Sequence, residues 1–211
     1  MTLAHGRAYR AIPGPSVIPD RVLQAMHQAA PNIYSGPLME TTAYVVDGLK
    51  TVARTSGHAA IYIANGHGAW EAALANSIAP GDRVLVLASG RFAEGWGQMA
   101  ERLGAEVTTL AVGARAWIEP DMLADALKKD LTYANPFQAI LVVQTDTASS
   151  VKNDIAALGE VVQKSGHPAL FMVDCIASLG SEPFEMDAWG VDVMVAGCQK
   201  GLMTPPGLAY V

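Results

Sequence analysis

From residue 61 onward, short apolar runs alternate with segments of helical periodicity. Apolar runs of about four to eight residues between turn residues are typical of buried strands. Such strands are predicted at 61–64, 84–88, 107–112, 139–143, 170–174, 191–196 and 208–211, with helices at 69–78, 93–103, 120–129 and 154–164. Strands that alternate with helices indicate an α/β fold, in which a mainly parallel sheet is flanked by helices.

The first sixty residues have a different pattern. An extended arm is expected at 8–18, where Pro13, Gly14 and Pro15 interrupt any regular structure. Helices are expected at 19–29 and 41–55, each with an apolar stripe at helical spacing. We therefore predict an N-terminal arm and helices over 1–60, followed by a large domain over 61–211.

Composition narrows the class of protein. Hydrophobic residues make up 51% of the 211 residues and charged residues 16%, as in a globular protein. The net charge of −6 and the scattered Lys and Arg argue against a nucleic-acid partner. No apolar run approaches membrane-spanning length, and the N-terminus lacks the apolar core of a signal peptide. Two cysteines fit a reducing cytosol, so a cytoplasmic location is expected, and the cysteines and five histidines lack metal-ligand spacing.

Candidate chemistry lies just after the predicted strands, because ligands of open α/β sheets bind beyond the carboxyl ends of the strands. Lys200 follows one apolar run and precedes another. Burial favours the neutral amine of a lysine, which is a nucleophile that forms a Schiff base with a carbonyl group. A solvated loop lysine would explain the same position.

The residues at 65–68, Asn-Gly-His-Gly, open a predicted helix, whose N-terminal amides can bind phosphate. A turn that needs glycine for its φ angle explains them equally well. The segment is no G-x-G-x-x-G fingerprint, which disfavours a dinucleotide site. Phe92 follows the next strand and is able to stack on a flat cofactor ring or to pack beneath a helix start.

A polar loop at 144–150 carries hydroxyl groups for a cofactor oxygen or a substrate, although turn chemistry alone would also select them. Asp174 ends an apolar strand, where an unpaired acid is costly. It either caps the following segment or keeps a pyridine nitrogen protonated, the role of an acid in pyridoxal phosphate enzymes. All these groups follow strands and are expected to face one crevice.

Four motifs occur in family order: GHGAWEAAL (66–74), DTASS (146–150), VDCIASLGSEPFEMDAWGVDV (173–193) and GCQKGLMTPPG (197–207). With them the chain resembles the class V aminotransferases of pyridoxal phosphate (PLP) fold type I, in particular the serine–glyoxylate and alanine–glyoxylate aminotransferases. The resemblance runs from PGPSVIP (13–19) to the last residue. It implies the PLP-dependent transferase fold type I and PLP as the cofactor.

The resemblance also implies individual roles around the cofactor ring. Lys200 matches the lysine that forms the Schiff base with the cofactor and then acts as general base. Asp174 matches the aspartate bonded to the pyridinium nitrogen. Thr147 matches the hydroxyl residue at the ring O3′, and Phe92 matches the residue that stacks on the ring.

Further roles implied by the resemblance concern the phosphate and the substrate. Asn65, Gly66 and His67 match the phosphate-binding turn, and Gln199 matches a glutamine that also supports the phosphate. Gly14 matches a glycine whose backbone lies near the substrate carboxylate.

The activity implied is transfer of an amino group from serine or alanine to glyoxylate, which gives glycine and hydroxypyruvate or pyruvate. Family members are usually homodimers and continue into a C-terminal small domain, which is expected to be missing here together with its substrate-binding arginine. Three alternatives stay open. One is another class V enzyme, such as an aminotransferase for aspartate, a desulfurase or a lyase. The others are a catalytically incomplete PLP-binding fragment and a nucleotide-binding α/β module.

Overall fold

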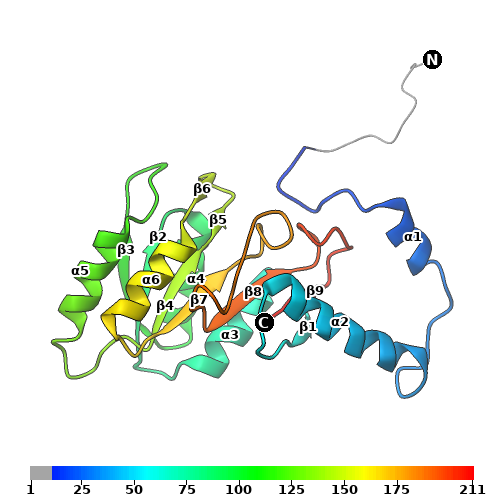
Figure 1. Cartoon of the computed structure of the whole chain (residues 1–211), viewed down its shortest axis with the longest axis horizontal. Helices are drawn as coiled ribbons and strands as arrows, with labels where there is room; N and C mark the ends of the chain where they lie inside the picture. The colour runs from blue at the N-terminus through cyan, green and yellow to red at the C-terminus, as the bar shows by residue number, and fades with distance from the viewer. Residues whose placement is uncertain (1–10) are drawn as a thin grey trace, which may run out of the picture.

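A seven-stranded, mainly parallel sheet forms the centre of the protein in a computed structural model that describes residues 11–211 (Figure 1). The strands are Ile61–Ile63 (β1), Arg83–Ala88 (β2), Glu106–Ala111 (β3), Ala139–Val143 (β4), Thr145–Asp146 (β5), Val151–Lys152 (β6), Leu170–Asp174 (β7), Val193–Gly197 (β8) and Leu208–Tyr210 (β9). The sheet order is β1-β9-β8-β7-β4-β2-β3, and β5 pairs with β6 in a separate hairpin. From β3 to β8 the neighbours are parallel, while β9 is antiparallel to both β8 and β1.

Helices cover both faces of this sheet. Within residues 11–211 they are Asp20–Met26 (α1), Pro37–Ala53 (α2), Gly66–Ser77 (α3), Arg91–Arg102 (α4), Pro120–Asp130 (α5) and Ile155–Ser165 (α6). Buried residues of α3 and α4 belong to one hydrophobic cluster, and those of α2, α5 and α6 belong to the other. The α/β fold predicted from the alternation of strands and helices is thereby confirmed.

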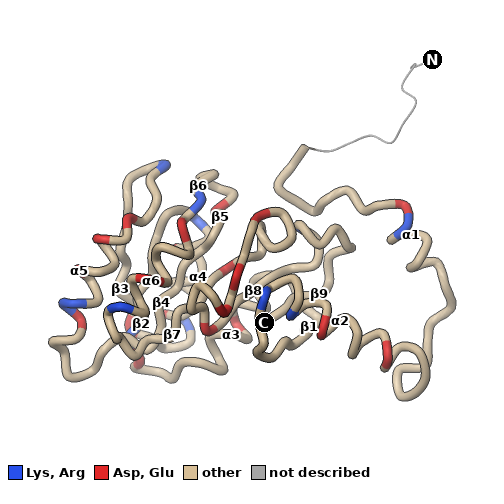
Figure 2. Tube along the Cα trace, in the orientation of Figure 1, with Lys and Arg blue, Asp and Glu red and all other residues tan. Residues whose placement is uncertain are grey.

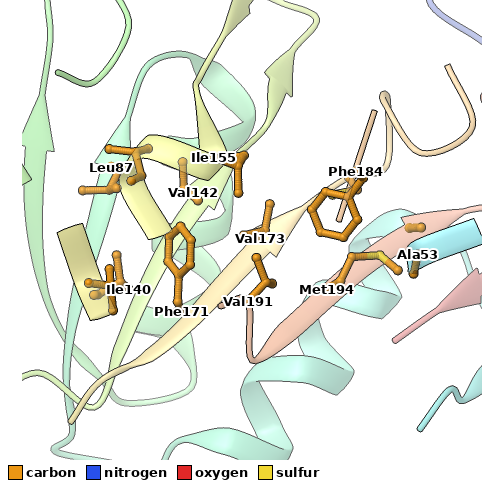
Figure 3. Packing of buried hydrophobic residues seen from close by; sticks show 14 of the residues in the cluster. Ala53, Leu87, Ile140, Val142, Ile155, Phe171, Val173, Phe184, Val191 and Met194 are labelled. Carbon is orange, nitrogen blue, oxygen red and sulfur yellow. The ribbon is translucent and has the colours of Figure 1, made fainter. Parts of the chain in front are cut away.

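The alternation of side chains along each strand explains why the central strands are apolar throughout. Val84 and Val86 of β2 pack on the side of α3 and α4, whereas Leu85 and Leu87 pack on the side of α5 and α6. Figure 3 shows the second cluster, in which Phe171 lies among aliphatic residues of neighbouring strands. A strand buried on both faces needs apolar residues at every position.

Some boundaries differ from the sequence-based expectation. The first helix ends at Met26 rather than near residue 29, and the second begins at Pro37 rather than at residue 41. Proline is favoured at the first helical position, because its missing N–H would have no acceptor there. The hairpin of β5 and β6 was not predicted, since strands of two residues are too short to show an alternating pattern.

The N-terminal helices contribute little to the core. No residue of α1 is buried, and in α2 only Leu49 and Ala53, near its C-terminal end, are buried. In Figure 1 α1 and the start of α2 extend away from the sheet. The division into 1–60 and 61–211 stays a prediction, and residues 8–10 of the predicted arm lie outside the described part of the chain.

Charged side chains of both signs are dispersed along the trace (Figure 2). Between residues 11 and 211, no helix is long and apolar enough to cross a membrane. The same part of the chain has no group of three His, Cys, Asp or Glu residues arranged to hold a metal ion.

Candidate active site

A pocket of about 270 Å³ lies beyond the carboxyl ends of the parallel strands. Its position follows from the topology, because β2, β4, β7 and β8 are parallel and end at the same edge. All the predicted site residues except the two glycines line it: Asn65, His67, Phe92, Thr147, Asp174, Gln199 and Lys200. The wall is completed by Trp70, Val143, Thr145, Ile176 and Ala177.

Lys200 lies in the loop that joins β8 to β9, as predicted, and its side chain is partly buried. Burial lowers the pKa of Lys200 below its ordinary value, an effect that the negative charge of Asp174 opposes. Its Nζ donates a hydrogen bond to the carbonyl oxygen of Pro13 at 3.1 Å. The Ser16 amide donates to the Gln199 carbonyl at 2.8 Å, so the segment around residues 13–16 is tied to the lysine loop.

Gly14 packs directly against the stem of this lysine. A Cβ atom at Gly14 would lie 2.7 Å from Cδ and 3.1 Å from Nζ of Lys200, and the residue has a φ of +148°. The backbone conformation therefore favours glycine, and a side chain at this position would displace the end of Lys200. The predicted role of Gly14 near a substrate carboxylate stays a prediction.

Asp174 is the last residue of β7, and only 3% of it is exposed. Burial raises the pKa of Asp174 to about 7, although hydrogen bonds from the Ile176 amide and the Trp70 indole lower it in part. Both donors lie 2.7 Å from the carboxylate oxygens. No ion-pair partner of Asp174 is found among residues 11–211, so its negative charge is left available for a bound group.

The segment 65–68, expected to lead into a helix at 69–78, already contains the N-cap and the first turn of helix α3. Asn65 is the N-cap, and its Oδ1 accepts a hydrogen bond from the Gly68 amide at 3.1 Å. The helix begins directly after Asn65, because this cap gives the Gly68 amide the acceptor that it lacks within the helix. Gly66 is needed for close packing rather than for its φ angle, since a Cβ there would lie 2.4 Å from Cδ1 of Ile176.

Asp146, the last residue of β5, ties the loop after β4 to the start of α4, and sequence reasoning missed this role. It is fully buried and accepts hydrogen bonds from the amides of Phe92 at 2.7 Å, Ala93 at 3.3 Å and Ala148 at 2.9 Å. These bonds cap the N-terminus of α4 and fix the two segments that carry Phe92 and Thr147. The sequence signal for Asp146 was an acid inside a short polar loop, which also fits a simple turn.

Trp70 lines the pocket but was not singled out by sequence reasoning, whereas Thr145 was included only among the hydroxyl groups of the polar loop at 144–150. Trp70 is 2% exposed and lies in the quoted motif GHGAWEAAL, but an apolar helix position gave no sign that its indole N–H reaches Asp174. The Thr145 hydroxyl is buried and has no hydrogen-bond partner in the part of the chain that the structure describes. An unpartnered buried hydroxyl is costly unless something binds there.

The groups that line the pocket match the chemical groups of PLP. First-turn amides of α3 lack intrahelical acceptors and suit a phosphate. The buried Asp174 carboxylate suits a protonated ring nitrogen, the Thr145 hydroxyl is free for a polar atom, and the Lys200 amine suits an aldehyde. The residues present therefore fit this cofactor, while their individual roles stay predictions.

Comparison with known proteins gives the same picture. The family model described as Aminotransferase class-V matches residues 9–211. A serine–glyoxylate aminotransferase of Methylorubrum extorquens is 38% identical over 98% of this chain and 51% of its own length. An L-aspartate–glyoxylate aminotransferase of Paracoccus denitrificans is 35% identical over 95% of this chain and 50% of its own length.

Solved structures agree in fold. The pyridoxamine–pyruvate aminotransferase of Mesorhizobium loti superimposes with a TM-score of 0.87 at 29% identity, covering 96% of this chain and 50% of that one. The chain thus spans about half the length of the relatives it matches. The chain belongs to the class V aminotransferase family, and this membership implies pyridoxal phosphate as its cofactor.

Proposed function

We propose that this chain provides the cofactor-binding part of an aminotransferase that moves the amino group of serine to glyoxylate. The observation that carries the proposal is the convergence of Lys200 and Asp174 on one pocket. These are an amine whose pKa is lowered by burial and an acid that makes no ion pair within residues 11–211. Transaminase chemistry needs both groups, one at the aldehyde of the cofactor and one at its ring nitrogen.

The residues that would hold the phosphate lie at the start of α3 and beside the lysine. The amides of Gly66 and His67 point from a helix N-terminus, where the dipole favours an anion. Asn65 and Gln199 add side-chain amides at the same pocket. These groups would bind the cofactor through its phosphate, which takes no part in the reaction.

The residues that would hold the ring are Phe92, Thr147 and Asp174. Phe92 offers an aromatic face, and the Thr147 hydroxyl can donate to a ring oxygen. Asp174 would accept a hydrogen bond from the protonated ring nitrogen. When bound, pyridoxal phosphate withdraws electrons from the Cα of the attached amino acid, and ring protonation strengthens this effect.

Lys200 has two tasks in the proposed reaction. Its amine would hold the aldehyde of a bound cofactor. Burial lowers the pKa of Lys200 and so favours the neutral amine, which would accept the proton from the substrate Cα and return it. Serine leaves as hydroxypyruvate, and the amino group passes to glyoxylate, which leaves as glycine.

Serine is the first choice of donor because the serine–glyoxylate relative has 38% identity. Aspartate is the second candidate, supported by the aspartate–glyoxylate relative at 35% identity. Alanine follows from the sequence resemblance. A desulfurase has less support, because it needs a mobile cysteine and both Cys175 and Cys198 are buried.

We also infer a homodimer. The N-terminal segment exposes apolar and aromatic side chains at Met26, Tyr34, Met39 and Tyr44, with exposed fractions from 54% to 85%. Several large apolar side chains exposed along one segment favour an interface there. Analytical ultracentrifugation tests the inference, since a monomer at micromolar concentration would contradict it.

Glycine formation from glyoxylate, with serine, aspartate or alanine as donor, tests the proposed activity. Lys200→Ala should lower turnover by more than about 10³-fold. Lys164→Ala is the matched control, because Lys164 is exposed on α6 in a pair with Glu160 and should leave turnover unchanged. Wild-type turnover in Lys200→Ala would overturn the proposal.

A further inference from the structure

Within residues 11–211, the indole of Trp70 is the one side chain that donates a hydrogen bond to the Asp174 carboxylate. Its Nε1 donates to Oδ2 at 2.7 Å, and the Ile176 amide donates to Oδ1 at 2.7 Å. Each carboxylate oxygen is thus fixed by one donor and keeps a further lone pair for another. The orientation of the carboxylate depends on both bonds, and only the bond from Trp70 can be removed by substitution.

The Trp70 ring is itself held on several sides. His67 meets it edge-on with ring centroids 4.6 Å apart, and Phe92 does so at 6.3 Å. Trp96 stacks on it at 6.0 Å with an interplanar angle of 17°. With 2% of its surface exposed, the indole cannot swing away, so its N–H has a fixed direction.

Few groups influence the ionisation of Asp174. Burial and the negative charge of Asp146 disfavour ionisation, whereas the Ile176 amide, the Trp70 indole and the positive charge of Lys200 favour it. The adjacent Cys175 thiol is also buried, and His67 lines the same pocket. Among these groups Trp70 is neutral at every pH, so its contribution is a hydrogen bond and not a charge.

We propose that Trp70 is a positioning residue that holds the Asp174 carboxylate ionised and directed at the cofactor ring nitrogen. The inference rests on the proposed function, because it gives Trp70 a part in the protonation of that ring. A carboxylate that loses a donor binds its own proton more tightly. Without the indole N–H, the proton shared between Asp174 and the ring nitrogen therefore shifts toward Asp174.

The test compares Trp70→Phe with Trp96→Phe. Trp96 is fully buried beside Trp70, but its Nε1 has no hydrogen-bond partner among residues 11–211, so Trp96→Phe removes an indole N–H that bonds nothing. The readout is the pKa of Asp174, followed by the carboxyl carbon resonance of ¹³C-labelled aspartate in the cofactor-free chain and assigned with Asp174→Asn.

The Asp174 pKa should rise by about one to two units in Trp70→Phe, because the carboxylate loses a hydrogen bond that favours its ionised form. Trp96→Phe should titrate as the wild-type chain does. Equal titration of Trp70→Phe and the wild type would overturn the proposal.

A second measurement needs no variant and so holds even where Trp70→Phe does not fold. In the wild-type chain the indole N–H resonance of Trp70 should shift with pH along the same curve as the Asp174 carboxyl, and that of Trp96 should not. A Trp70 resonance that ignores the titration of Asp174 would overturn the proposal.

The two proposals fail in different ways. Loading with pyridoxal phosphate and borohydride reduction reports the attachment to Lys200, which does not depend on Trp70. If wild-type chain takes up no cofactor, the proposed function fails while the carboxyl titration still decides the role of Trp70. In protein loaded with the cofactor, Trp70→Phe should still form the adduct but should change the pH dependence of cofactor absorption. An unchanged pH dependence would contradict the positioning role of Trp70.

Discussion

Asp130 and Asp174 are both almost completely buried, with 1% and 3% of their surfaces exposed. They lie at opposite ends of the parallel strands, Asp130 at the N-terminal ends and Asp174 at the C-terminal ends. Asp130 ends α5 near the start of β2, whereas Asp174 ends β7 in the pocket. The Asp130 carboxylate has partners within the protein. Arg83 Nη1 lies 2.6 Å from it and His167 Nε2 3.1 Å, and the Phe137 amide donates at 2.6 Å.

The pKa values of the two acids differ accordingly. Burial alone would raise the pKa of Asp130, but the hydrogen bonds from Phe137, Arg83 and His167 lower it below its ordinary value. Asp174 has two neutral donors and no cation in ion-pair contact within residues 11–211, and its pKa is raised to about 7 although the charge of Lys200 lowers it slightly. A buried charge that the fold neutralises itself serves structure, whereas one left without a cation indicates that a ligand completes the site.

The strongest test of this difference is Asp174→Ala. It should lower transamination by about 10²- to 10⁴-fold, because the ring nitrogen loses the group that keeps it protonated. Retention of the cofactor should change little, since Lys200 and the phosphate contacts remain. Kinetics with serine and glyoxylate, together with the absorbance of bound cofactor, measure both. An unchanged rate would contradict the role of Asp174.

Asp130→Ala should affect stability instead of activity. Removing one partner of a buried ion pair costs about 3–5 kcal/mol of unfolding free energy, because Arg83, with 18% of its side chain exposed, is left unpaired. Urea denaturation measures the loss, with the exposed Asp47→Ala as control at within about 0.5 kcal/mol. If Asp130→Ala lowered activity of folded protein as Asp174→Ala does, the contrast between the two acids would be wrong.

The pH dependence of stability should have opposite signs for the two acids. The folded-state pKa of Asp174 is raised, so its contribution is present below the unfolded value near 3.8 and is lost as pH rises through about 7. The Asp130 pKa is lowered, so its contribution is lost as pH falls below its unfolded value. In cofactor-free chain, Asp174→Asn should therefore remove about 2 kcal/mol of the difference in stability between pH 5 and pH 8. An identical pH profile in Asp174→Asn would show that Asp174 is already paired.

Much of the fold was predictable from sequence because the central strands are apolar on both faces and the helices between them are periodic. The hairpin Thr145–Asp146 with Val151–Lys152 was not, because its strands are too short to show a pattern, and the buried Asn153 that follows it is held by distant segments. The Nδ2 of Asn153 donates to Ser89 Oγ at 2.7 Å and to the Val143 carbonyl at 2.8 Å. Contacts of this kind between distant segments leave no periodic signal.

The site shows the same division. Lys200 and Asp174 were predictable because they follow strands and match family motifs, and both line the pocket. Trp70 was missed because its indole N–H matters only once α3 is packed against β7, and Thr145 was predicted only as one of several hydroxyl residues in the loop after β4. The cluster around Asp130 was missed because Arg83 and His167 are 47 and 37 residues away from it in sequence.

Borohydride reduction of the chain loaded with pyridoxal phosphate, followed by intact mass and peptide mapping, tests the central claim most directly. That claim is that the pocket beyond the parallel strands holds the cofactor through Lys200. We predict a single adduct of the mass of reduced pyridoxal phosphate on the peptide with Lys200, and none on the exposed Lys164. Absence of an adduct, or one spread over surface lysines, would contradict it.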